Sequence, residues 1–115
     1  MKNSILIITG GTGGHVIPAV NFYKYIERKN IEVNLLTDKR GSKYINGINK
    51  QNIYKINSSH LSGNIFFKLK AIFKLFIGCF QSLRIFIKLK PKIIVSFGSY
   101  ASFMPLVCFI LLKFF

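Results

Sequence analysis

The sequence predicts an α/β fold, a Rossmann-like parallel sheet with flanking helices. Short apolar runs alternate with longer stretches of helical periodicity along its 115 residues, and such repeated strand–helix units build parallel sheets. Glycine-rich turns follow two of the apolar runs, at residues 10–14 and at Gly98. Because ligands bind at the carboxyl ends of parallel strands, we expect both turns on one ligand-binding rim.

The first half of the chain contains three of the predicted strands. Residues 4–9 form an apolar run short enough for a strand buried on both faces. Residues 15–30 predict a helix, because Pro18 suits a first turn and apolar residues recur every three or four positions. Three shorter elements follow: a strand at 32–37, a short helix at 43–48 and a strand at 52–56.

The second half begins with a long helix, predicted from about residue 64 to residue 90, where Pro91 ends it. Residues 92–97 are rich in β-branched side chains and predict a fourth strand. Residues 101–115 then predict the start of another helix.

Residues 93–112 carry no charge, and this length suits a membrane-spanning helix. The β-branched start of the segment, the turn at Gly98 and the interruption at Pro105 favour a buried strand, turn and helix instead. We therefore expect no spanning segment here.

The chain is strongly basic and also apolar. Its formal net charge is +14 and its hydrophobic residues make up 50%, which argues against a disordered basic tail and against most simple nucleic-acid-binding modules. The acidic residues are Glu27, Glu32 and Asp38, so almost all of the net charge lies after residue 38. We expect this later part to face an anionic surface.

The two cysteines, Cys79 and Cys108, lie far apart in apolar stretches and have no partners at metal-ligand spacing. We expect buried free thiols in a reducing compartment. The N-terminal residues lack the pattern of a secretory signal peptide, which predicts a protein of the cytoplasmic side. No metal and no cofactor are expected.

The turn at residues 10–14 is expected to hold a phosphate. Its four glycines allow positive φ and close backbone approach, and the following helix aims unpaired N–H groups at the same point. Two common phosphate motifs do not fit, because Val16 replaces the third glycine of a dinucleotide fingerprint and His15 replaces the lysine of a Walker loop. The alternative is a tight strand-to-helix turn that holds no ligand.

The predicted long helix carries a basic stripe beside a wide apolar surface. At about 100° per residue, one stripe contains Lys70, Lys74, Gln81, Arg84 and Lys88, and the opposite side contains Ile72, Leu75, Cys79, Leu83 and Phe86. Such a helix is typical of an anionic membrane surface, and the expected contacts are Lys68, Lys70, Phe73, Lys74, Phe76, Ile77, Phe80, Arg84 and Lys88. The alternative is an ordinary sheet-packed helix with a solvated lysine face.

Three segments carry a resemblance to a known family. They are Gly-Gly-Thr-Gly-Gly-His-Val-Ile-Pro-Ala at 10–19, Thr-Asp-Lys-Arg-Gly at 37–41 and Pro-x-Ile-Ile-Val-Ser-Phe-Gly-Ser-Tyr-x-Ser at 91–102. In order and spacing they resemble the N-terminal half of the MurG family, bacterial transferases of glycosyltransferase family 28. The first segment is specific for this family and its relatives, and the other two support it.

The resemblance implies an inverting GT-B transferase with two Rossmann-like domains and a cleft between them. Such an enzyme moves GlcNAc from UDP-GlcNAc to O4 of the MurNAc sugar of undecaprenyl-linked lipid I, giving lipid II for peptidoglycan. The N-terminal domain presents lipid I, and the C-terminal domain holds most of the nucleotide. The implied localisation is peripheral, on the cytoplasmic side of the inner membrane.

The same resemblance assigns roles to residues of the two glycine turns. The donor side comprises Thr12, Gly13 and Gly14, and the acceptor side comprises Gly11, Gly98, Ser99 and Tyr100. His15 is the candidate base or a phosphate contact, since an imidazole pKa of ~6.5 suits proton transfer. The alternative is a structural histidine that is hydrogen-bonded to the loop, and His60, in a polar loop, is expected to be exposed.

The chain departs from the family pattern in two ways. The family has Gly-Gly-Tyr where this chain has Gly-Ser-Tyr at 98–100. Residues 1–115 also correspond to an incomplete N-terminal domain without the nucleotide domain, so we expect no transfer by this chain alone. The alternative function is a non-catalytic membrane anchor and acceptor-binding half of a split transferase, whose partner is a separate C-terminal domain chain. A nucleic-acid binder is supported by charge alone.

Overall fold

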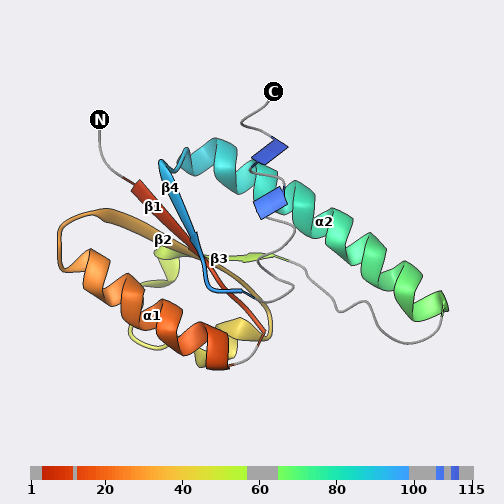
Figure 1. The fold of residues 1–115 in the computed structure, drawn as a ribbon, viewed down its shortest axis with the longest axis horizontal. Coiled ribbons are helices and arrows are strands. Elements are labelled where there is room, and N and C mark those ends of the chain that lie inside the picture. Colours follow the sequence, from red (N-terminus) through yellow and green to blue (C-terminus); the bar gives the residue numbers. More distant parts are fainter. Residues whose placement is uncertain (1–3, 12, 57–64, 99–105, 108–109, 112–115) are drawn as a thin grey trace.

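The computed structural model describes residues 4–11, 13–56, 65–98, 106–107 and 110–111. Within these residues, strands and helices alternate in the predicted order (Figure 1). The elements are β1 (Ser4–Ile8), α1 (Gly13–Glu27), β2 (Glu32–Asp38), the 3₁₀ turns η1 (Gly41–Tyr44) and η2 (Lys50–Asn52), β3 (Ile53–Ile56), α2 (Ile65–Leu89) and β4 (Ile93–Ser96).

The four strands form one parallel sheet in the order β3-β2-β1-β4. Strand β1 is central, because Ile5 pairs with Val33 of β2 on one side and with Ile93 of β4 on the other. All of its residues are buried, which explains why it is an uninterrupted apolar run. The predicted Rossmann-like parallel sheet is therefore confirmed.

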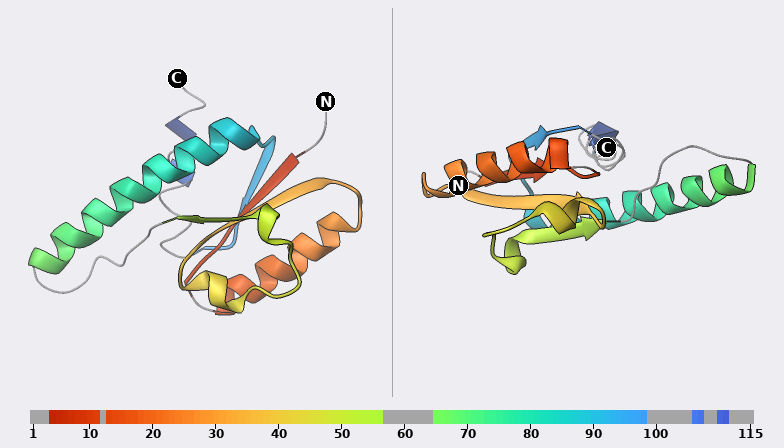
Figure 2. Two further views of the ribbon diagram at one scale, coloured as in Figure 1. Left: turned by 180° about the vertical axis from the view of Figure 1, so that it is seen from behind. Right: turned by 90° about the horizontal axis from the view of Figure 1, so that it is seen from below.

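Helices α1 and α2 cover opposite faces of the sheet (Figure 2). On the α1 face, Ile5 and Ile7 belong to one core cluster with Tyr23. On the α2 face, Leu6 and Ile8 belong to a second cluster with Phe86. Because successive residues of a strand point to opposite faces, β1 supplies both cores.

Helix α1 begins earlier than the predicted start at residue 15 and ends at Glu27. Beyond it, Asn30 has a positive φ of 58°, a conformation that commonly follows a helix end. The predicted apolar stripe is buried and comprises Val16, Ala19, Val20, Tyr23 and Ile26.

The short helix predicted at 43–48 is wrong. The chain instead forms the single 3₁₀ turn η1 (Gly41–Tyr44), and Gly47 has φ of 78°, which a helix does not accommodate. Most of the helix predicted at 101–115 lies outside the described residues.

The predicted apolar face of the long helix is only partly covered by the sheet. Cys79, Leu83 and Phe86 pack into the core, but Ile72 is 43% exposed. The buried positions are otherwise small residues, Ala71, Gly78 and Ser82. The N-terminal part of α2 extends past the described strands (Figures 1 and 2), so its apolar pattern continues beyond the sheet that would bury it.

Cys79 is half-buried and disulfide-bonded, so the prediction of a free thiol is wrong at this position. Cysteines far apart along a chain still pair wherever the fold brings their Cα atoms close enough, and spacing in the sequence does not show this. Cys108 lies outside the described residues.

Candidate functional site

The glycine-rich turn leaves β1 at the carboxyl edge of the sheet. Gly10 and Gly11 are buried, and Gly11 has φ of 81°, which residues with a side chain rarely adopt. The backbone N–H of Gly11 donates a 3.1 Å hydrogen bond to Oδ1 of Asp38. The path of the turn is therefore fixed by the protein itself.

Asp38, at the end of β2, ties this turn to the next loop. Its Oδ1 also accepts a 2.7 Å hydrogen bond from the N–H of Gly41, and the side chain is buried. A Cβ on Gly41 would lie 2.8 Å from Cα of Gly10 and would collide with Oγ1 of Thr37. One carboxylate oxygen thus holds two tightly packed loops together. Nothing in the local sequence pattern predicted this role of Asp38.

His15 lies near the start of α1, and its side chain is exposed. Its Nδ1 is 3.0 Å from the carbonyl oxygen of Phe97, just after β4. A carbonyl oxygen only accepts hydrogen bonds, so the Nδ1–H donates and the neutral ring keeps its lone pair on Nε2. The β4 end therefore sets the tautomer of His15.

The second glycine turn begins beside the same imidazole. Gly98 has φ of 91°, and a Cβ at this position would lie 3.3 Å from Nδ1 of His15. Glycine is therefore required here both by the backbone conformation and by the close approach of His15. The predicted convergence of the two turns on one rim is seen for His15, Phe97 and Gly98.

This rim is the point where the order of strands reverses. From β1, the chain first adds β2 and then β3 on one side, and later adds β4 on the other side. In open parallel sheets, such a switch point leaves a crevice at the carboxyl ends of the strands, where ligands bind. His15 lies over this position because α1 follows β1 and its ring reaches the end of β4.

Gly13 and Gly14 form the first turn of α1, and Gly14 is exposed. A Cβ on Gly13 would lie 3.2 Å from the ring of Tyr44, so this tyrosine of η1 packs beside the turn. Tyr44 is a neighbour of the site that the sequence analysis missed, because nothing in its local pattern links it to Gly13.

Three of the predicted site residues, Thr12, Ser99 and Tyr100, lie outside the described residues. The structure brings His15 and Gly98 together, with Gly13 and Gly14 on the same helix start as His15. The N–H of Gly11 is engaged by Asp38. Within residues 4–11, 13–56, 65–98, 106–107 and 110–111, no group of three or more His, Cys, Asp or Glu side chains has metal-binding geometry.

The predicted membrane-contact residues fall into two parts along α2. We call residues 65–76, the part that extends past the strands in Figures 1 and 2, the free end of α2. It exposes Lys68, Lys70, Phe73, Lys74 and Phe76. Farther along, Phe80, Arg84 and Lys88 are exposed and Ile77 is half-buried.

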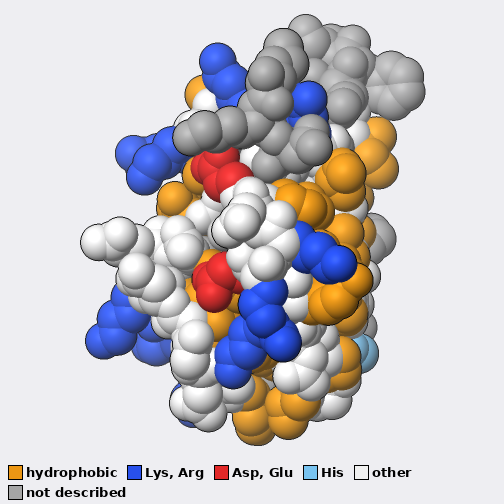
Figure 3. All heavy atoms as spheres, turned by 90° about the vertical axis from the view of Figure 1, so that its left-hand side faces the viewer, with side chains coloured by type: hydrophobic (Ala, Val, Ile, Leu, Met, Phe, Trp, Pro, Cys, Tyr) orange, Lys and Arg blue, Asp and Glu red, His pale blue; other side chains and the backbone are white. Residues whose placement is uncertain are grey.

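Exposed aromatic side chains dominate the free end of α2. Phe66 is 77% exposed, Phe73 is 68% exposed and Phe76 is 59% exposed, whereas large apolar side chains of soluble proteins are usually buried. In the part of the chain that the structure describes, no helix is long and apolar enough to cross a bilayer. On the face shown in Figure 3, basic groups are spread widely and acidic groups are few.

Residues 5–113 match the glycosyltransferase family 28 N-terminal domain. The chain is 33% identical over 113 residues to a UDP-N-acetylglucosamine–N-acetylmuramyl-(pentapeptide) pyrophosphoryl-undecaprenol N-acetylglucosamine transferase of Bartonella tribocorum, covering 97% of this chain and 30% of the relative. The transferase of the same name from Rhodospirillum centenum is 34% identical over 99 residues, covering 86% of this chain and 26% of the relative.

The fold is similar to the crystal structure of MurG from Acinetobacter baumannii. The TM-score is 0.73 at 27% sequence identity, and the match covers 96% of this chain and 33% of that chain. The chain therefore spans about a third of the length of the relatives that it matches.

Proposed function

Because its residues 5–113 place the chain in glycosyltransferase family 28, we propose that it contributes the acceptor-binding part of a GlcNAc transferase. The proposed reaction moves GlcNAc from UDP-GlcNAc to undecaprenyl-pyrophosphoryl-MurNAc-pentapeptide (lipid I), giving lipid II. The observation that carries the proposal is His15, which is exposed at the strand switch point with its tautomer set by Phe97.

In the proposed step, His15 is the general base. Its Nε2 takes the proton of the C4 hydroxyl of MurNAc, and O4 attacks C1 of GlcNAc. The bond between C1 and the diphosphate oxygen breaks, and UDP leaves with the electron pair and inversion at C1. A positioned base of this kind contributes about 10²–10⁴-fold to a rate, and an imidazole with a free Nε2 lone pair suits it.

The start of α1 is proposed to face the departing diphosphate. Gly13 and Gly14 lie in its first turn, where unpaired N–H groups and the helix dipole favour negative charge. Together with Thr12, they would stabilise the charge that develops on UDP without a metal ion. Gly98, Ser99 and Tyr100 are proposed to contact the acceptor, with Gly11 shaping the turn beside them.

Nucleotide binding is proposed to need a second domain in addition to residues 1–115. The relatives are about three times as long as the matched segment, and a GT-B transferase holds its nucleotide between two domains. We therefore propose that residues 1–115 act together with a C-terminal nucleotide domain that completes the cleft.

The free end of α2 is proposed to lie on the cytoplasmic face of the inner membrane, where the lipid-linked acceptor resides. Its exposed Phe73 and Phe76 would enter the headgroup region, and Lys68, Lys70 and Lys74 would face anionic lipids. Each such lysine contributes about 1 kcal/mol near an anionic leaflet, so the three together give useful reversible binding.

Flotation with vesicles of phosphatidylcholine and phosphatidylglycerol tests the membrane role. The variant Lys68→Glu/Lys70→Glu/Lys74→Glu is expected to lose at least about tenfold in vesicle binding. A control with the same charge change on exposed lysines elsewhere, Lys29→Glu/Lys43→Glu/Lys50→Glu, should lose much less. Equal losses in both variants would mean that net charge alone explains the binding.

A fusion tests the catalytic role. Residues 1–115 are joined to the part of the Bartonella tribocorum transferase that follows its matched segment, and GlcNAc transfer to lipid I is measured. His15→Asn is expected to lower kcat by about 10²–10⁴-fold, with His60→Asn as the control. Full activity of His15→Asn would exclude the base role.

The second candidate function is the non-catalytic membrane anchor and acceptor-binding half of a split transferase. The exposed phenylalanines of the free end of α2 favour it, because they serve attachment whether or not this chain supplies a base. It predicts that the unfused chain binds vesicles containing lipid I, and that the fusion with His15→Asn keeps its activity.

A further inference from the structure

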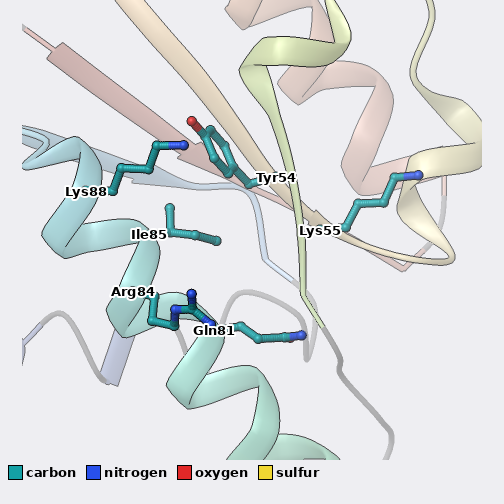
Figure 4. A pocket seen from close by; sticks show the side chains of 6 residues that line it. All are labelled: Tyr54, Lys55, Gln81, Arg84, Ile85 and Lys88. Carbon is teal, nitrogen blue, oxygen red and sulfur yellow. The ribbon is translucent and has the colours of Figure 1, made fainter.

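A groove lies between α2 and the edge strand β3, on the face of the sheet opposite α1 (Figure 4). Its volume is about 400 Å³, and it is lined by Tyr54, Lys55, Gln81, Arg84, Ile85 and Lys88. None of the described residues of the two glycine turns lines it, so it is distinct from the part of the proposed transfer site around His15 and Gly98.

The groove gathers basic and hydrogen-bonding groups over an apolar base. Arg84 and Lys88 are four residues apart on α2, a spacing that places them on one helix face, and Gln81 precedes them by one turn. Figure 4 shows these side chains and Tyr54 around the opening, whereas Lys55 points away from them. Ile85 lies between them and belongs to the partly buried apolar layer.

Tyr54 holds Lys88 at this groove. The Nζ of Lys88 lies 5.5 Å from the centroid of the Tyr54 ring, a cation–π geometry. None of the described residues lining the groove is acidic, so neither cation has a carboxylate partner from its walls. The groove therefore carries two positive charges that the described residues of its walls do not neutralise.

We propose that this groove binds the phosphate group of a phosphorylated ligand. The planar guanidinium of Arg84 offers two parallel N–H donors to phosphate oxygens, and Lys88 adds a compact positive charge. The hydroxyl of Tyr54 supplies a further donor. The volume exceeds that of a phosphate, so the organic part of the ligand also fits within the groove.

The proposal does not depend on the transferase reaction, and a matched pair of variants tests it. Arg84→Gln/Lys88→Gln removes the two groove cations. Lys29→Gln/Lys50→Gln removes two exposed cations outside α2, so both variants lose equal charge. All four side chains are exposed, and circular dichroism checks that the variants are folded.

Titration with inorganic pyrophosphate, followed by amide and arginine Nε resonances in NMR, gives the affinity. The groove variant is expected to bind at least tenfold more weakly, and the matched control within twofold of the parent chain. Arg84→Lys keeps the charge but loses the two parallel N–H donors, and it is expected to bind pyrophosphate several-fold more weakly. Equal weakening in the groove variant and the control, or no weakening in the groove variant, would overturn the proposal.

Two further probes assign the source of the phosphate. Glycerol phosphate represents a soluble ligand, and short-chain phosphatidylglycerol below its micelle concentration represents a lipid headgroup. Tighter binding of the lipid, lost in Arg84→Gln/Lys88→Gln, assigns the groove to a headgroup. Equal binding of both probes, also lost in that variant, assigns it to a soluble phosphate, whereas binding of both that survives in that variant overturns the site.

Discussion

The Nδ1 of His15 and the carbonyl oxygen of Phe97 are 3.0 Å apart, so a backbone group at the end of β4 orients the side chain proposed as the base. We expect the neutral imidazole of His15 to carry its proton on Nδ1 and its lone pair on Nε2. Long-range ¹H–¹⁵N correlation spectra report the tautomer directly. A predominant Nε2–H form would contradict the assignment.

Gly98→Ala is expected to disturb this orientation. The φ of 91° at Gly98 is unfavourable for alanine, and the new Cβ would lie 3.3 Å from Nδ1 of His15. We expect about 1–2 kcal/mol of destabilisation together with a changed His15 spectrum. Gly47→Ala is the matched control, because Gly47 also has a positive φ, of 78°, but its Cβ would meet only the flexible end of Lys24. Gly47→Ala should lose stability and leave the His15 spectrum unchanged.

Asp38→Ala is expected to lower the free energy of unfolding by about 2–4 kcal/mol, because it leaves the N–H groups of Gly11 and Gly41 without their acceptor. Asp38→Asn keeps an acceptor oxygen at this position and should lose less stability than Asp38→Ala. Urea denaturation measures both changes. A loss in Asp38→Asn as large as that in Asp38→Ala would show that the charge, rather than the acceptor geometry, holds the loops.

Tyr23 gives the chain a specific alkaline sensitivity. Burial raises the pKa of its hydroxyl above the usual 10.0, with Glu27 acting in the same direction and Asn52 opposing it. Below pH 10 the hydroxyl is neutral in both states and stability is unaffected. Above pH 10, unfolded chains release this proton more readily than folded chains, so stability falls as the pH rises.

Tyr23→Phe removes this contribution. The Tyr23 hydroxyl lies near Asn52 and Glu27 but makes no hydrogen bond of standard geometry among the described residues, so its deletion is expected to change stability at pH 7 by less than about 1 kcal/mol. Between pH 9 and pH 11, the unfolding temperature should fall less steeply with pH for Tyr23→Phe than for the parent chain. Tyr25→Phe controls for the loss of one tyrosine, and identical slopes for both variants would contradict the prediction.

The strands were predictable because a strand that is buried on both faces needs an uninterrupted run of apolar residues. Ile5, Leu6 and Ile7 are apolar in succession because β1 has a helix on each side. The approach of His15 to Gly98 followed in outline from parallel topology, which places strand ends on one rim. Its hydrogen bond to Phe97 did not follow, because contacts between residues distant in sequence depend on the packed position of α1.

Asp38 and the orientation of α2 show where local pattern is insufficient. The role of Asp38 depends on two backbone N–H groups from different loops, which sequence spacing does not place. Ile72 shares the apolar side of α2 because the periodicity continues along the helix, but the sheet is too short to cover that part of the helix. Helical periodicity predicts which side of a helix is apolar, but only the fold shows how much of that side is covered by the sheet.

The central place of β1 also has a kinetic consequence. Ile5 of β1 pairs with Val33 on one side and with Ile93 on the other, so the first strand cannot complete its pairing until the chain has been synthesised as far as β4. Closing so long a loop costs chain entropy before any contact repays it, and topologies of this kind fold slowly. Until β4 arrives, one edge of β1 stays open to other chains, and during this interval the growing polypeptide is most exposed to aggregation.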